Sequence, residues 1–154
     1  MKLTIHYSGE LPISFFELKN HPEKIIKKMP RVKTIEKMDE LDYRITSQPY
    51  VLHSGLKIKG VSHVNLHVED NQISWSRSQH HCEETCNGCI EGTAVAGEND
   101  TTHLTGEICV HHPMINSLTA AFAAGMTKKM GERIMDEFIA NFNDESFENE
   151  IPDA

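Results

Sequence analysis

Residues 115–142 read INSLTAAFAAGMTKKMGERIMDEFIANF. Apolar residues recur in this stretch at every fourth position, which is the spacing of one face of an α-helix. They are Leu118, Phe122, Met126, Met130, Ile134, Phe138 and Phe142. At about 1.5 Å per residue, a helix of this length spans about 40 Å, enough to cross a whole sheet. The stretch therefore predicts one long amphipathic helix that covers a sheet.

The first half of this helix is slim, because it carries small residues at positions 120, 121, 123, 124 and 125. Small side chains leave room between a helix and the sheet beneath it. Close contact between helix and sheet, without any cavity, is the alternative that the same residues allow.

The chain before the long helix alternates apolar and polar residues, the pattern of half-buried strands. It predicts strands at 2–8, 32–38, 41–46, 56–69, 72–79, 90–97 and 102–112. Turns are expected at Asp39-Glu40 and at 98–100, and a bend or bulge at Gly60 and Ser62. Between the first two strands, residues 12–28 predict two short helices, the second beginning at Pro22. This order predicts an α+β protein.

Three of the four cysteines and two adjacent histidines lie within ten residues. They are His80, His81, Cys82, Cys86 and Cys89. Thiolate and imidazole ligands suit zinc, copper(I) or an iron–sulfur cluster. A fourth ligand is expected from His80, His81, Cys109 or His111, which completes a tetrahedral zinc site. Because Asn-Gly is a turn dipeptide, Asn87-Gly88 predicts that this loop is a hairpin tip. The pattern predicts a bound metal, with zinc favoured over an iron–sulfur cluster.

Two alternatives remain for the cysteine loop. Cys86-x-x-Cys89 has the spacing of thioredoxin-type dithiols, and Cys82 with Cys86 could form a redox-active pair. The loop could also carry free thiols without a function. The sequence beginning at Met1 shows no apolar signal segment, so we expect a reducing, cytoplasmic setting.

Length and charge limit the function further. A chain of 154 residues fits one domain, here residues 1–143, followed by an acidic tail at 144–154 that we expect to be disordered. The net charge of −8 disfavours nucleic acid and anionic membranes as partners. No apolar run reaches the roughly 20 residues that span a bilayer. The sequence predicts no oligomeric state.

Catalytic motifs are missing from the sequence. There is no G-x-S-x-G, no H-E-x-x-H and no glycine-rich phosphate loop. Glu107 and His111 share one strand face and could form an acid–base pair, but such pairs are common on solvated sheets. The sequence therefore favours a binding protein over an enzyme and leaves catalysis as the weaker alternative.

The order of one strand, two short helices, six strands and a long helix resembles the START-like superfamily, also called SRPBCC or helix-grip. The resemblance covers residues 1–143, and small prokaryotic members are the most similar. Its local cues are Asn20-His21-Pro22-Glu23-Lys24, similar to the Asp-Pro-Glu of that superfamily, Met29-Pro30-Arg31-Val32, similar to its Leu-Pro-Gly-Val, and the following Ile35-Glu36.

The resemblance implies a curved antiparallel sheet of about six to seven strands that grips the long C-terminal helix. In the superfamily, an apolar cavity between sheet and helix holds lipids or other hydrophobic small molecules. Here the candidate lining residues are Phe15, Phe16, Trp75, Phe122, Met126 and Met130. The expected function is binding of such a molecule, with the zinc loop beside the cavity. The alternative is a metal, iron–sulfur or redox-sensing protein centred on the cysteines.

Overall fold

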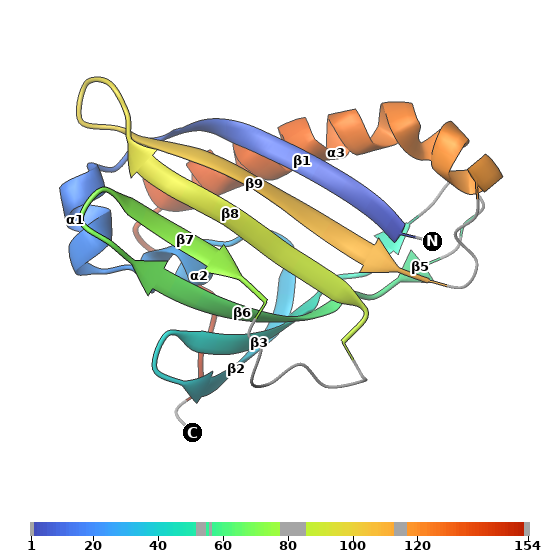
Figure 1. The fold of residues 1–154 in the computed structure, drawn as a ribbon, viewed down its shortest axis with the longest axis horizontal. Coiled ribbons are helices and arrows are strands. Elements are labelled where there is room, and N and C mark those ends of the chain that lie inside the picture. The colour runs from blue at the N-terminus through green and yellow to red at the C-terminus, as the bar shows by residue number, and fades with distance from the viewer. Residues whose placement is uncertain (1, 52–54, 56, 78–85, 113–116, 153–154) are drawn as a thin grey trace.

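Seven strands form one sheet in which every neighbouring pair is antiparallel (Figure 1). This computed structural model describes residues 2–51, 55, 57–77, 86–112 and 117–152, without the side chains of 2, 50 and 117–126. In spatial order the strands are β1 (Lys2–Leu11), β9 (Thr102–His111), β8 (Gly88–Ala96), β7 (Gln72–Ser76), β6 (Val61–Val68), β3 (Asp42–Ser47) and β2 (Val32–Asp39). A small second sheet pairs β4 (Tyr50–Val51) with β5 (Lys57–Ile58).

The helices lie where the sequence predicts them. Two short helices, α1 (Phe15–Asn20) and α2 (Lys24–Lys27), follow β1, and α3 (Ser117–Asn143) ends the domain. In Figure 1, α3 runs behind the sheet on the side of β1. The α+β class, the antiparallel sheet of six to seven strands and the long terminal helix are thus confirmed.

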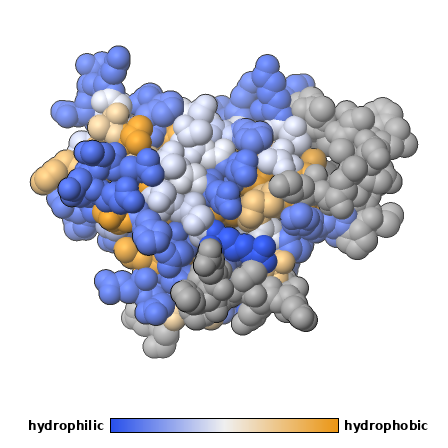
Figure 2. Space-filling view, in the orientation of Figure 1, coloured by the Kyte–Doolittle hydropathy of each residue, from blue (hydrophilic) through white to orange (hydrophobic). Residues whose placement is uncertain are grey.

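The two faces of the sheet differ in polarity, as alternation along a half-buried strand requires. The inner face, toward α3, is apolar and includes Ile5, Tyr7, Trp75 and Leu104, all buried. Threonine, histidine and glutamate side chains occupy the outer face, which Figure 2 shows as mostly hydrophilic to neutral over the middle of the sheet. The inner face is therefore the one that needs a cover.

Glycines make room for two large inner-face rings, those of Trp75 and Tyr7. Gly92 and Gly106 lie opposite each other on β8 and β9. A Cβ atom at Gly92 would overlap the indole of Trp75, and one at Gly106 would overlap the phenol ring of Tyr7. Both rings therefore lie flat over a neighbouring strand and fill the inner layer.

Among the strands, β1 is the one that α3 approaches most closely in the described part of the chain. A Cβ atom at Gly131 would collide with the backbone carbonyl of His6, so only glycine allows this approach. Farther along the helix, the ring of Phe138 packs on Tyr7 with their centroids 5.9 Å apart. The C-terminal half of α3 is thus fixed to one edge of the sheet.

The chain after α3 packs on α2. The side-chain amide nitrogen Nδ2 of Asn149 donates to the carbonyl oxygens of Ile26 and Met29 at 3.0 and 2.8 Å. The buried ammonium of Lys28 donates to the carbonyls of Asp144 and Phe147. The sequence predicts a disordered tail from residue 144, whereas these side chains give the chain defined contacts as far as Asn149.

Several predicted boundaries differ from those of the structure. The strand predicted at 56–69 is divided into β5 and β6, because the chain leaves the ladder at Lys59-Gly60. The second short helix begins at Lys24 rather than Pro22. Asn87-Gly88 is not a hairpin tip, because Gly88 is the first residue of β8.

Replacing Gly131 tests the contact between α3 and β1. Helix propensity alone favours alanine over glycine by about 1 kcal/mol. We expect Gly131→Ala instead to lower the free energy of unfolding by about 1–3 kcal/mol, because the methyl group forces α3 from the His6 carbonyl. Glu132→Ala, at the next and exposed position, is the control and should change the free energy of unfolding by less than about 0.5 kcal/mol. Denaturant unfolding measures both, and a more stable Gly131→Ala protein would disprove the contact.

Candidate functional site

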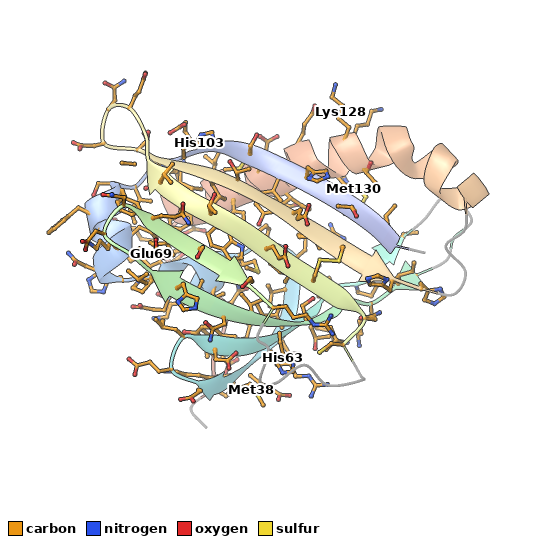
Figure 3. The ribbon with its side chains drawn as sticks, in the orientation of Figure 1. Met38, His63, Glu69, His103, Lys128 and Met130 are labelled. Carbon is orange, nitrogen blue, oxygen red and sulfur yellow. A yellow bond between two sulfur atoms is a disulfide. The ribbon has the colours of Figure 1, made fainter. Side chains whose placement is uncertain are left out.

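The predicted cavity residues fall into three groups. Met130 is half-buried on the sheet side of α3 (Figure 3), and Phe15 and Trp75 pack into the core. Phe16 is 75% exposed, so its prediction as a cavity residue is wrong. The reason is helical geometry, because α1 buries Leu18 and a residue two positions away points to the opposite side. The side chains of Phe122 and Met126 lie outside those described.

Trp75 stands out within this core. It is 1% exposed, and its indole Nε1–H has no hydrogen-bond acceptor among the described residues. Buried tryptophan N–H groups usually find a partner, and leaving one unpaired costs about 1–3 kcal/mol. The inner face thus presents a buried polar donor that has no partner among the described residues.

An opening of about 320 Å³ lies between α3 and the chain around β2 and β4. Its apolar wall is formed by Met130 and Ile134, one helical turn apart on α3, together with Val51 of β4. Arg31, Lys129 and Arg133 line the same opening. A volume of this size lies at the lower end of the roughly 300–1,000 Å³ that small-molecule pockets occupy.

Two residues of the predicted metal set are joined to each other. Cys89 and Cys109 face each other on β8 and β9 and form a disulfide, seen as the yellow bond in Figure 3. Both side chains lie on the outer face, away from α3. Because a disulfide sulfur is not a thiolate, neither residue is available as a zinc ligand in this oxidation state.

Cys86 lies beside a histidine that the sequence analysis did not select. Its Sγ is 3.2 Å from Nδ1 of His63, whose side chain is 1% exposed (His63 is labelled in Figure 3). Asn87 fixes this arrangement, because its side chain accepts from the Val61 amide and donates to the Lys59 carbonyl. An imidazole at this distance can take the proton of a thiol, which leaves the more reactive thiolate.

The remaining predicted metal ligands are not brought together in the part of the chain described. His80, His81 and Cys82 lie outside the described residues, and His111 is exposed at the end of β9. Among the described residues, no group of three or more His, Cys, Asp or Glu side chains could hold a metal ion. The zinc site therefore stays a prediction.

Glu107 pairs with a different histidine from the one predicted. Its carboxylate lies 3.5 Å from Nδ1 of His6, which β1 places directly opposite. A second pair on the same face joins Glu10 to His103 at 2.7 Å (His103 is labelled in Figure 3). The Thr101 hydroxyl and then the His103 ring hold the pKa of Glu10 below its usual value. Both pairs are largely exposed, as expected of solvated side chains on an outer face.

The disulfide could have been found from the sequence. The predicted turn at 98–100 is centred on Asn99, and a symmetric antiparallel hairpin about that residue pairs position 89 with 109. The structure has this register from Gly88 to Ala96. No comparable signal exists for His63, because alternation along β6 assigns it to the polar face.

No family model matches the chain, and no curated protein does. Solved structures do match. A protein from Thermus thermophilus is 12% identical, with a TM-score of 0.58 over 92% of this chain and 97% of its own. A START superfamily protein from Mycobacterium smegmatis is 15% identical, with a TM-score of 0.51 over 91% and 97%. An aromatase/cyclase from a Streptomyces species is 13% identical, with a TM-score of 0.51 over 92% of each chain.

Identities this low show the fold alone. None of the described helices is long and apolar enough to cross a membrane. The chain has the START-like helix-grip fold, with its long helix closing the inner face of a seven-stranded antiparallel sheet.

Proposed function

We propose that the protein binds a hydrophobic small molecule between the inner face of the sheet and α3. The observation that carries this proposal is the Trp75 indole N–H, buried in an apolar layer without an acceptor among the described residues. A ligand with a carbonyl or hydroxyl oxygen would satisfy this donor while its apolar surface replaces water. Core packing alone leaves the cost of the unpaired donor uncompensated.

The position of α3 supports the same proposal. The helix is fixed to β1 at the edge of the sheet by Gly131 and Phe138, and farther from that edge it borders the opening at Met130. We therefore expect a ligand to approach the inner face at this opening beside the helix. The similar structures include a START superfamily protein and an aromatase/cyclase, which agrees with a fold used to enclose small molecules.

An uncharged probe tests this proposal. N-Phenyl-1-naphthylamine fluoresces strongly in apolar surroundings and accepts energy from tryptophan, of which the chain has only Trp75. We expect saturable binding of one molecule per chain, with quenching of the Trp75 emission. Met130→Gln should weaken binding about three- to tenfold, because it removes roughly 1 kcal/mol of apolar contact at the opening.

Met38→Gln is the matched control, because Met38 is an exposed methionine on β2, far along the sheet from β1 (Figure 3). The Met38→Gln protein should bind the probe with the same affinity as the unchanged protein. Probe binding that is absent, or that never saturates, would rule out the proposed function.

A second candidate function is thiol chemistry on the outer face. The specific observation is the contact of Cys86 with the buried imidazole of His63, three residues before a cysteine that is already in a disulfide. Cys86 thiolate could attack that disulfide, forming a Cys86–Cys89 bond and releasing the Cys109 thiolate, so that no outside oxidant is needed. This exchange would make the cysteine segment a site of disulfide rearrangement without net oxidation.

The rate at which iodoacetamide alkylates Cys86 tests the role of His63. We expect His63→Gln to slow alkylation at pH 7 by about tenfold, because the thiol loses its proton acceptor. His67→Gln is the control, since His67 lies on the same face of β6 but is exposed. Peptide mass spectrometry follows the modification at Cys86 itself, and thermal unfolding verifies that both variants are folded. Equal rates in the two variants would exclude the pair as a reactive site.

Zinc binding remains a proposal that depends on oxidation state. Reduction would release Cys89 and Cys109, which could join Cys86 and the segment that contains His80, His81 and Cys82. We expect untagged protein purified with a reductant to hold about one zinc per chain by elemental analysis. The oxidised protein should hold none. A reduced protein without zinc would leave thiol exchange as the only role proposed for these cysteines.

A further inference from the structure

Cations gather at the opening beside α3. Arg31, Lys129 and Arg133 line it, and none of the described residues that line it is acidic. Lys129 and Arg133 lie four residues apart, so both project from the same side of α3. Arg31 reaches the opening from the start of β2, where its backbone has a positive φ of 61°.

This gathering is unusual for the charge of the chain. The protein has 23 acidic and 15 basic residues, so an average surface patch would be acidic. Elsewhere, two lysines are paired with carboxylates, Lys19 with Asp70 and Lys24 with Glu17, at 3.3 and 3.2 Å. Neither Lys129 nor Arg133 forms an ion pair with any described residue. Their charges are therefore not neutralised within this part of the chain.

The positive charge continues from the opening along the adjoining edge of the sheet. Lys33 follows Arg31 by two residues, and its ammonium lies close to that of Lys59. This contact and the repulsion between the two ammonium groups lower the pKa of Lys59. Ordinary surface packing separates such charges, so their closeness indicates a region of positive potential that an anion would stabilise.

We propose that the ligand of this site is a small amphipathic anion. This inference rests on the function proposed above. The apolar part of this anion contacts Val51, Met130 and Ile134 and continues toward the inner face of the sheet. Its terminal anionic group, a carboxylate in the simplest case, is held at the opening by Lys129 and Arg133, with Arg31 contributing to the same positive field.

Each part of such a molecule matches one part of the wall. The methionine and isoleucine side chains lie one turn apart on α3, and the two cations lie one turn apart on the adjacent side of the same helix. One helix therefore contacts an amphipathic ligand along its whole length. The guanidinium of Arg133 can bind a carboxylate through two hydrogen bonds. An uncharged ligand would leave these cations without a counter-ion.

A pair of probes that differ only at the head group tests the inference. Decanoate and decan-1-ol have equally long chains, and at pH 8 the carboxylate is ionised. Calorimetric titration should give decanoate at least tenfold tighter binding, although the alcohol is the more hydrophobic molecule. Lys129→Gln and Arg133→Gln should each weaken decanoate binding about fivefold or more, and leave decan-1-ol binding unchanged.

Lys128→Gln is the matched control. It removes the same charge from the neighbouring position of α3, but Lys128 does not line this opening and projects away from the sheet (Figure 3). Its affinity for decanoate should stay within twofold of the unchanged protein. Equal or tighter binding of decan-1-ol would overturn the inference and leave the proposed function standing. An equal loss of decanoate affinity in Lys128→Gln, Lys129→Gln and Arg133→Gln would have the same meaning. Failure of both probes to bind would overturn the inference together with the proposed function.

Discussion

The close approach of α3 to β1 fixes where the long helix lies over the sheet. Gly131 lets the helix backbone reach the carbonyl of His6, and Phe138 then packs on Tyr7. Because the helix is fixed at the edge strand, it covers the apolar face of the sheet without lying tightly on its middle. The opening at Met130 follows from this position. A side chain at Gly131 would change all of these at once.

The two faces of the sheet carry separate chemistries, because strand alternation sends successive side chains to opposite sides. The inner face is largely apolar, carries the Trp75 donor that has no partner among the described residues, and suits a hydrophobic ligand. The outer face holds the Cys89–Cys109 disulfide and the Cys86–His63 contact. The disulfide joins β8 to β9, and the inner side chains of these strands pack in the same layer as Trp75. The two proposed sites are therefore neighbours through the thickness of one sheet.

Periodicity predicted the fold well, since seven of the observed strands and the long helix follow directly from apolar spacing. The disulfide was also predictable from the sequence, because a turn centred on Asn99 places Cys89 opposite Cys109. Other features depend on contacts between distant segments, which local patterns do not record. His63 belongs to the polar face of β6 and is buried beside a residue 23 positions later. Arg31 joins Lys129 and Arg133 only because the start of β2 lies near α3. Phe16 was misassigned because the register of the six-residue helix α1 was not evident.

The proposed function requires that a ligand enters the layer between sheet and helix and reaches Trp75, the single tryptophan of the chain. The indole N–H resonance of Trp75 reports on it directly, because a ¹H–¹⁵N spectrum contains one such signal for this chain. Saturation with N-phenyl-1-naphthylamine should shift this resonance and slow exchange of its proton with water. A probe that binds, according to its fluorescence, while the indole signal keeps its position would place the ligand outside this layer and contradict the account.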